Sequence, residues 1–337
     1  MLQKGNKQME IRRVGVVGLG LLGRGITASL LAHGLEVIVH DREQSMRQEI
    51  VPYLEGVMDE IAQHRPDCAV ACAGWRGHFT WAADLESFAS CDLVIESVSE
   101  LLAAKRELLL QMEAIVGPEV PLASNTSALP ITEIQRGFAH PERVLGMHWA
   151  EPAFATRFLE LIGGDQTSPA VLERMKAFGK RLGKEPCIVN DIPGFIVNRL
   201  GYAKFREAMH LLETGVADAA TIDRAYRNAA GLWASFCGPF RWIDITGGAA
   251  LYARAMERVV PELSCVTEVP AALQRQAELD RKAIATEGDN AATGFYGETP
   301  EQKKEWLELL HRQAWEIEAL RSRMDKAMAE AGVTKAE

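Results

Sequence analysis

A histidine and a glutamate have the residue types and surroundings of a general base. His148 ends the apolar segment 143–147, and Glu160 lies inside the apolar segment 158–162. A carboxylate in so apolar a strand is costly unless it is paired, and a nearby histidine would satisfy it. In such a pair the imidazole removes a hydroxyl proton, while the carboxylate orients the ring and stabilises its cationic form. A single histidine among eight can also be structural, so the prediction depends on the pair.

Two polar residues are candidates for the same site. Ser127 follows the apolar segment 120–124, and Asn198 interrupts the apolar start of a helical pattern at residue 195. Ser127 could instead cap a turn before Pro130. A buried amide needs hydrogen-bond partners, which Asn198 could find either within the fold or in a substrate oxygen.

A glycine pattern marks a phosphate-binding turn. Gly18, Gly20 and Gly23 form G-x-G-x-x-G directly after an apolar segment and at the start of a helical one. The first glycine permits the turn, the second lets the backbone approach a pyrophosphate, and the third allows close helix–strand packing. The helix N-terminus faces the phosphates. The alternative is a packing turn with no ligand.

An aspartate in the expected place identifies the dinucleotide. Asp41 ends the next apolar segment, 21 residues beyond Gly20, where a carboxylate accepts hydrogen bonds from the ribose hydroxyls and repels a 2′-phosphate. We therefore predict NAD rather than NADP. The residues predicted here to bind it are Gly18, Gly20, Leu21, Leu22, Gly23, Asp41 and Arg42.

An alternation of short apolar segments and helical patterns must position these residues. The predicted strands are 13–17, 36–40, 78–82, 92–96, 120–124, 143–148, 158–162 and 186–189. Helices are predicted at 21–32 and 101–116, and a longer one that ends at Gln63 is predicted to kink or break at Pro52. Segment 65–77 is predicted to be a loop. This alternation predicts a mostly parallel sheet with right-handed crossovers, whose carboxyl edge binds ligands.

Beyond residue 190 only helical periodicity remains. Helices are predicted at 195–213, 218–230, 248–259, 271–285 and 300–329. The first is apolar nearly all round, which predicts a buried central helix. The last carries an apolar stripe that indicates core or dimer packing. The predicted fold is an α/β Rossmann-like domain with a mostly parallel sheet at 11–190, followed by an all-α C-terminal domain at 191–330.

Composition excludes several classes of protein. The length of 337 residues predicts about two domains, and 47% hydrophobic with 25% charged residues excludes a disordered or collagen-like chain. A net charge of −9 argues against nucleic-acid binding. No apolar run reaches the ~18 residues of a membrane span, and residues 1–10 are too polar for a signal peptide. Six cysteines without a C-x-x-C motif predict free, buried thiols in the cytoplasm. No metal site is predicted.

Several motifs, in order, resemble those of the L-3-hydroxyacyl-CoA dehydrogenases. The resemblance covers residues 12 to 300. The motifs are the glycine turn, Val94-Ile95-Glu96 with Glu100 and Lys105, segment 125–132, Gly146-Met147-His148, Glu160, segment 193–200, Gly238-Pro239-Phe240 and Gly294-Phe295-Tyr296.

The resemblance implies a role for each matching residue. His148 would be the catalytic base and Glu160 its partner, with Ser127 and Asn198 as ligands of the substrate 3-hydroxyl or the catalytic water. The matching positions at the cofactor would be Glu100, Lys105 and Asn125. It also implies homodimers formed through the helical domain, which would bind substrate as well. NAD would take a hydride from the carbinol carbon, giving a 3-keto product.

Two departures from the family pattern concern the substrate. The family has Asn before Pro152, whereas this chain has Glu151. This carboxylate would repel an anionic group and could accept a cationic group or an extra hydroxyl; alternatively, it is a surface acid without a role. No lysine lies between Lys7 and Lys105, although CoA-binding members hold the CoA phosphates with basic residues in this region. Arg157, close to the histidine–glutamate pair, could clamp a carboxylate or lie in solvent.

Three functions follow as alternatives. The first is an NAD-dependent 3-hydroxyacyl-CoA dehydrogenase, and the second is a dehydrogenase of a free hydroxy acid, similar to L-gulonate and L-carnitine dehydrogenases. The third is an NAD-binding protein with little catalysis. All three have a small-molecule ligand and no nucleic-acid or membrane partner.

Overall fold

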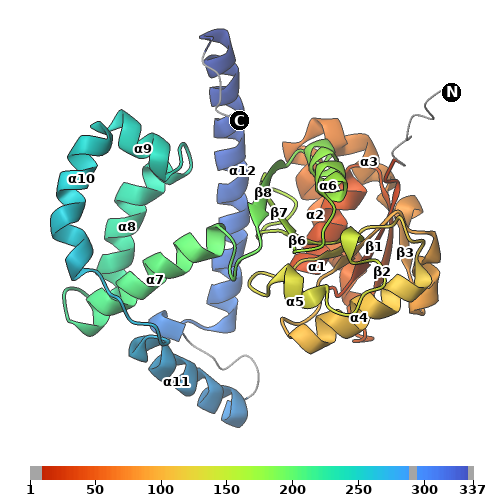
Figure 1. Ribbon diagram of the computed structural model, residues 1–337, viewed down its shortest axis with the longest axis horizontal. Coiled ribbons are helices and arrows are strands. Elements are labelled where there is room, and N and C mark those ends of the chain that lie inside the picture. Colours follow the sequence, from red (N-terminus) through yellow and green to blue (C-terminus); the bar gives the residue numbers. More distant parts are fainter. Residues whose placement is uncertain (1–9, 288–293, 333–337) are drawn as a thin grey trace. The chain divides into compact units, whose positions relative to one another are not determined.

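The computed structural model describes residues 10–287 and 294–332 (Figure 1). The chain divides into two compact units, one up to Arg199 and one from Leu200. The first unit contains the sheet, and the second is helical.

An eight-stranded sheet forms the centre of the first unit, in the order β3-β2-β1-β4-β5-β6-β7-β8. All neighbouring strands are parallel except β6 and β7. The mostly parallel sheet is therefore confirmed, and the predicted strand positions agree within two residues. The strands are β1 (Arg13–Val17), β2 (Glu36–His40), β3 (Phe79–Trp81), β4 (Leu93–Glu96), β5 (Leu122–Ser124), β6 (Val144–His148), β7 (Phe158–Gly163) and β8 (Glu185–Asn190).

Helices connect these strands and cover both faces. From β1 the chain proceeds to β2 and β3 on one side, and β4, β5 and β6 follow on the other. Right-handed crossovers therefore place the two sets of helices on opposite faces. The order changes direction between β1 and β4, and open α/β sheets bind ligands at the carboxyl ends of the strands at such a point. The helices are α1 (Leu21–Ala32), α2 (Met46–His64), α3 (Ala69–Gly74), α4 (Leu102–Ile115), α5 (Ile131–Ile134) and α6 (Pro169–Arg181), with 3₁₀ turns η1 (Pro66–Cys68), η2 (Trp75–His78), η3 (Leu85–Ser90) and η4 (Pro141–Arg143).

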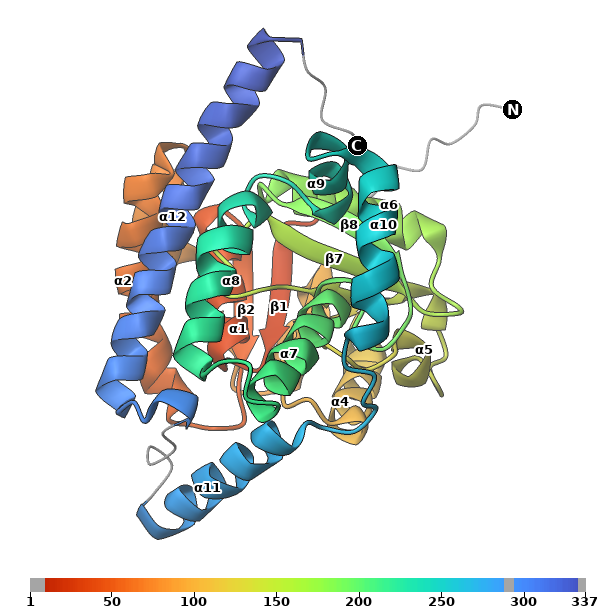
Figure 2. The same ribbon diagram turned by 90° about the vertical axis from the view of Figure 1, so that its left-hand side faces the viewer.

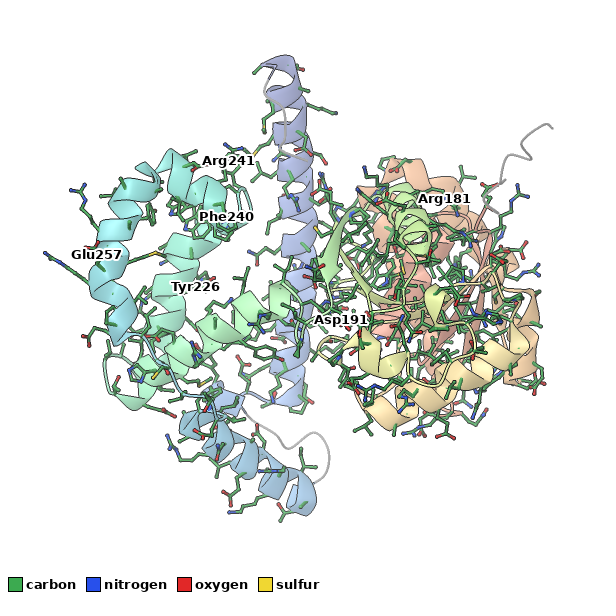
Figure 3. All side chains as sticks on the ribbon, viewed as in Figure 1. Arg181, Asp191, Tyr226, Phe240, Arg241 and Glu257 are labelled. Carbon is green, nitrogen blue, oxygen red and sulfur yellow. The ribbon has the colours of Figure 1, made fainter. Side chains whose placement is uncertain are left out.

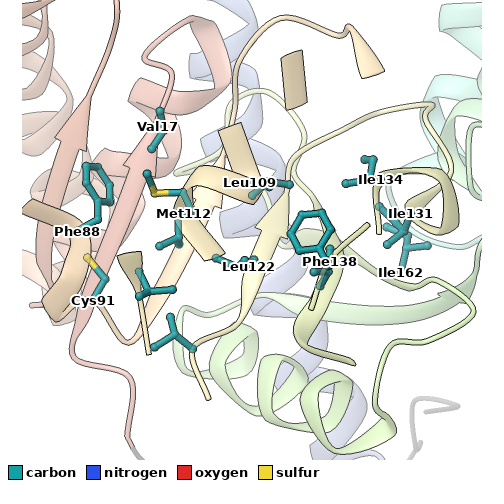
Figure 4. Close-up of a cluster of buried hydrophobic side chains, with 14 of the residues drawn as sticks. Val17, Phe88, Cys91, Leu109, Met112, Leu122, Ile131, Ile134, Phe138 and Ile162 are labelled. Carbon is teal, nitrogen blue, oxygen red and sulfur yellow. The ribbon is translucent and has the colours of Figure 1, made fainter. Parts of the chain in front are cut away.

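An apolar cluster fills the space between α4, α5 and the sheet (Figure 4). Leu109 and Met112 of α4 and Ile131 of α5 have no exposed surface. Phe88, from η3, is equally buried and packs into the same cluster. The predicted helical period of 101–116 is confirmed, because its apolar side chains meet this core.

Local predictions differ from the structure at two places. The predicted alternatives at Pro52 were a kink or a break, and α2 continues through Pro52 without a break. Segment 65–77 is helical rather than a loop, because it forms η1, α3 and most of η2. Cys68, Cys72 and Trp75 are buried at helical spacing there, and the small residues around them hid this period.

The second unit consists of helices among its described residues. They are α7 (Val197–Glu213), which begins in the first unit, α8 (Ala219–Ala234), α9 (Pro239–Ile245), α10 (Gly248–Val259), α11 (Ala271–Glu287) and α12 (Pro300–Glu330), with η5 (Val260–Glu262) and η6 (Gly294–Tyr296). Asp218 caps α8, and Thr299 with Gln302 forms a capping box at the start of α12. Figure 2 shows α12 as a single long helix. The all-α prediction is confirmed.

The prediction that α7 is a buried central helix was wrong. Described residues of α7, α8, α9 and α10 include none that is buried. Leu200 and Phe205 are 57% and 50% exposed, and Phe240 (Figure 3) is 84% exposed. An apolar sequence indicates that its side chains favour burial. It does not indicate whether other residues of the same chain bury them.

The cysteines are only partly as predicted. All six are free, and Cys68, Cys72 and Cys91 are buried, whereas Cys187 and Cys265 are exposed. Burial raises the pKa of the Cys91 thiol to about 12, which keeps this side chain neutral and unreactive. Among the described helices, none has the length and apolar character that crossing a membrane requires.

Candidate active site

His148 and Glu160 form a buried pair at the junction of β6 and β7. The two residues lie directly opposite each other in the antiparallel register, and the imidazole Nδ1 donates to Glu160 Oε2 at 2.9 Å. His148 is 6% exposed and Glu160 is 2% exposed. With Nδ1 facing the carboxylate, Nε2 is the ring nitrogen that can take a proton from a substrate.

The second oxygen of Glu160 binds the start of α7. Glu160 Oε1 accepts hydrogen bonds from the backbone N–H groups of Ile196 and Val197, at 3.1 and 3.0 Å. Negative charge is stabilised at a helix N-terminus. Glu160 therefore has partners on both oxygens, which explains how an apolar strand tolerates a carboxylate.

Ser127 and Asn198 are brought together. Asn198 is half-buried, and its Nδ2 donates to the backbone carbonyl of Ser127 at 2.8 Å. Glu100 Oε1 accepts from the Ser127 N–H at 2.9 Å and from the Thr126 hydroxyl at 2.6 Å. These contacts hold the loop that carries the Ser127 hydroxyl.

Asn125 joins this loop to the segment that follows His148. Its Oδ1 accepts from the Trp149 N–H at 2.9 Å, and its Nδ2 donates to Ser97 Oγ at 3.1 Å. The carboxyl ends of β4, β5 and β6 are therefore cross-linked through one amide. Ser127 and His148 lie on these neighbouring ends, as the sequence predicted.

Lys105 lies inside the fold at this edge. Its ammonium group is 1% exposed and bonds Glu96 Oε1 at 2.8 Å and Glu100 Oε2 at 3.2 Å. Glu96, which has no exposed surface, also accepts from Ser124 Oγ at 2.6 Å. Since a buried ion pair persists only when it is fully hydrogen-bonded, this network braces the site. A cofactor contact of Lys105 or Glu100 stays a prediction.

The glycine turn has the geometry of a phosphate cradle. A Cβ on Gly23 would lie 1.8 Å from the Gly18 carbonyl, and one on Gly18, which has a φ of +92°, would lie 2.5 Å from the Ser97 carbonyl. A Cβ on Gly20 would meet no protein atom within 4 Å. The packing of the turn therefore requires glycine at residues 18 and 23. At Gly20 the absence of a side chain leaves space beside the backbone. Beside this space α1 begins with Leu21 and has neither a capping side chain nor an acidic residue in its first turn, so its N–H groups suit a pyrophosphate.

Asp41 lies beside this turn. Its Oδ2 accepts from the Leu19 N–H at 2.6 Å, and its Oδ1 accepts from the Glu43 N–H at 2.9 Å. A carboxylate oxygen has a further lone pair for a ribose hydroxyl. Arg42, next to it, pairs with Glu43 at 3.3 Å. The residues present therefore fit NAD.

The two residues assigned to substrate have partners in the fold. Glu151 is half-buried near Tyr53 of α2, and burial together with the Glu151 charge raises the pKa of that phenol. The Arg24 guanidinium stacks on the Tyr53 ring at 4.7 Å. Arg157 pairs with Glu185 of β8 at 3.1 Å. Their contact with a substrate stays a prediction.

Three residues of this region were not predicted as site residues. Glu96 was matched only as part of a family motif, although it ends an apolar strand, the same signal that identified Glu160. Lys184, which is 5% exposed, donates to the carbonyls of Ala153 and Thr156 after β6, and Asp191 caps α5. No local pattern indicates these last two, because their partners are distant in the chain.

Two family models together match most of this chain. The chain matches the family model of the 3-hydroxyacyl-CoA dehydrogenase NAD binding domain over residues 13–192, and that of the 3-hydroxyacyl-CoA dehydrogenase C-terminal domain over residues 194–296.

Individual relatives extend over most of the chain. It is 29% identical to 5-formyl-3-hydroxy-2-methylpyridine 4-carboxylate 5-dehydrogenase of Mesorhizobium japonicum, over 87% of this chain and 93% of that protein. It is 34% identical to L-carnitine dehydrogenase of a Pseudomonas species, over 75% and 78%. A crystal structure of the pyridine-carboxylate enzyme, described as an NAD+-dependent dismutase, has a TM-score of 0.79 at 27% identity, covering 94% of this chain and 99% of that one. The chain therefore belongs to the 3-hydroxyacyl-CoA dehydrogenase family and is an NAD-dependent dehydrogenase of that type.

Proposed function

We propose that this dehydrogenase oxidises a hydroxyl group of a small free acid, with His148 as the base. The observation that carries the reaction is the buried pair of His148 and Glu160, joined at 2.9 Å, and the choice of a free acid rests on the arginines described below. An imidazole held by a carboxylate is suited to take a hydroxyl proton at neutral pH.

The side chains of the site have distinct roles in this reaction. His148 Nε2 takes the proton of the substrate hydroxyl, and Glu160 stabilises the imidazolium that forms. The Ser127 hydroxyl and the Asn198 amide orient the substrate oxygen. When bound, NAD supplies the acceptor for the hydride that leaves the carbinol carbon. Gly20 and the first turn of α1 hold the pyrophosphate of NAD, and Asp41 holds the adenosine ribose.

Three arginines of the lysine-poor region have acidic partners, which supports a substrate without CoA. Arg42 pairs with Glu43, Arg65 pairs with Asp67, and Arg76 pairs with Glu55. Acidic neighbours thus oppose the positive charge that CoA phosphates would need. The two relatives compared above are also named for free carboxylic compounds, carnitine and a pyridine carboxylate.

A second candidate is the 3-hydroxyacyl-CoA thioester itself. It is favoured by the family models, which match residues 13–192 and 194–296. The reaction and the base would be the same. The substrates would differ only in carrying a CoA thioester instead of a free carboxylate.

One assay separates these candidates. NADH formation is followed with L-carnitine and free 3-hydroxy acids, and separately with 3-hydroxybutyryl-CoA. Turnover of free acids only supports the proposal, and turnover of the thioester only replaces it with the second candidate. His148→Gln should lower turnover by about 10²–10⁴-fold. NADH affinity should stay within about twofold, because His148 ends β6 whereas the glycine turn that would bind the cofactor follows β1. Unchanged turnover would remove the proposed base.

We also propose a homodimer formed through the helical unit. Leu232 of α8 and Phe240 of α9 are 78% and 84% exposed, and exposed apolar side chains that form a contiguous patch mark protein interfaces. Sedimentation velocity should give twice the mass of the chain. Phe240→Glu should shift the protein to the monomer, whereas a monomeric parent protein would contradict the proposal.

A further inference from the structure

Segment 191–198, between β8 and the first turn of α7, is anchored to the site at both ends. Asp191 accepts hydrogen bonds from the backbone N–H groups of Ile131 and Thr132, at 2.9 and 2.7 Å. Asn198 donates to the Ser127 carbonyl at 2.8 Å. The ends of this segment are thus tied to α5 and to the loop that carries Ser127.

The middle of the segment has an unusual backbone. Gly194 has a φ of +78° and Phe195 a φ of +48°. Within residues 10–287 and 294–332, Phe195 is the one non-glycine residue with a positive φ. Bulky side chains disfavour this conformation, so the surrounding contacts must hold it.

Those contacts converge on the catalytic pair. Phe195 has no exposed surface, and its ring lies 5.8 Å from that of His148 at an angle of 55°. Phe158 meets the imidazole edge-on at 5.4 Å. Directly after Phe195, the N–H groups of Ile196 and Val197 bind Glu160. One reversal of the backbone therefore delivers an aromatic ring to the base and two hydrogen-bond donors to its partner.

We propose that Phe195 is a positioning residue, whose left-handed backbone aims the start of α7 at Glu160 and whose ring fixes the orientation of His148. This inference rests on the proposed function, in which His148 is the base. The Phe195 side chain is a hydrocarbon and has no group that could take or give a proton. Its effect passes through the imidazole, which must keep its proton on Nδ1 so that Nε2 is available.

The test uses Phe195→Leu with a matched control. Phe88 is an equally buried phenylalanine of the apolar cluster to which Phe195 also belongs. Its ring lies against Gly15 of β1, so Phe88→Leu removes the same volume at another strand and leaves the pair of His148 and Glu160 unchanged. Both full-length variants are labelled with ¹⁵N-histidine, and the His148 signals are assigned by their loss in His148→Gln. Long-range proton–nitrogen spectra then report which ring nitrogen carries the proton, with no substrate required.

We expect a single Nδ1–H tautomer in the parent protein and in Phe88→Leu, and a mixture of tautomers in Phe195→Leu. Turnover of the substrate that the NADH assay selects should fall about tenfold or more in Phe195→Leu, with an unchanged KM and unchanged NADH affinity. A single tautomer and full turnover in Phe195→Leu would overturn the proposal and leave Phe195 as core packing. Should Phe195→Leu not fold, Phe195→Met fills the space with a flexible chain and is read in the same way. Failure of the proposed function is distinguishable, because it appears as full turnover in His148→Gln.

Discussion

Glu160 lies opposite His148 in the antiparallel pairing of β6 and β7 and uses its two oxygens for two different purposes. Oε2 holds the imidazole, and Oε1 accepts from the N–H groups of Ile196 and Val197. The orientation of the base and the start of α7 are therefore determined by the same carboxylate. Removing its charge should affect the chemistry more than the fold.

The substitution Glu160→Gln tests this separation. The amide oxygen can still accept from the α7 N–H groups, but the NH₂ group would donate to His148 Nδ1 and favour the wrong tautomer. We expect turnover to fall on the order of a hundredfold or more, with only a small change in melting temperature. Steady-state kinetics and thermal unfolding check this. Glu36→Gln, on the exposed end of β2, should leave turnover unchanged; equal turnover in both variants would contradict the role of Glu160.

Gly20→Ala and Gly23→Ala should fail in opposite ways. A Cβ at residue 20 meets no protein atom within 4 Å, whereas one at residue 23 lies 1.8 Å from the Gly18 carbonyl. Gly20→Ala should keep its melting temperature and bind NADH about tenfold more weakly or worse, because the backbone can no longer approach the pyrophosphate. Gly23→Ala should lose about 1–3 kcal/mol of unfolding free energy. NADH fluorescence titration and thermal unfolding measure the two effects, and tight NADH binding by Gly20→Ala would contradict the cradle.

Asp41→Asn should relax the choice between NAD and NADP. The carboxylate that accepts from ribose hydroxyls also repels a 2′-phosphate, and the neutral amide removes that repulsion. The ratio of NADPH to NADH affinity should rise about tenfold. Arg42→Ala in the same background should reverse the gain, because the guanidinium would attract the phosphate. An unchanged ratio would place the discrimination elsewhere.

The ionisation of Glu100 should make the folding stability of the protein depend on pH in the acid range. Burial raises the pKa of this carboxyl, but the Thr126 hydroxyl, the Lys105 charge and the Ser127 N–H together outweigh it, so the pKa lies below its ordinary value of 4.5. A lowered pKa in the folded state contributes stability above the unfolded value, and this contribution is lost as pH falls through the folded value. Glu100→Gln should therefore be less stable at neutral pH and lose less of its melting temperature as the pH falls below 4.5. Parallel losses in the two proteins would rule out this contribution.

The sequence by itself determined the elements and the types of residue at the site. The apolar segments located the strands, because buried parallel strands need continuous apolar runs. The glycine spacing and Asp41 predicted the cofactor turn, and the carboxylate in an apolar strand predicted a partner for Glu160. These signals are local, since each depends on a burial preference or a backbone conformation within a few residues.

Only the tertiary structure decided which atoms meet. The register of β6 and β7 places Glu160 opposite His148, and the left-handed backbone at Phe195 brings the start of α7 to the same carboxylate. The buried site of Lys105 was hidden for the same reason, because hydrogen-bond partners come from distant segments. A local pattern reports what a side chain requires, but strand order and register determine which distant group supplies it.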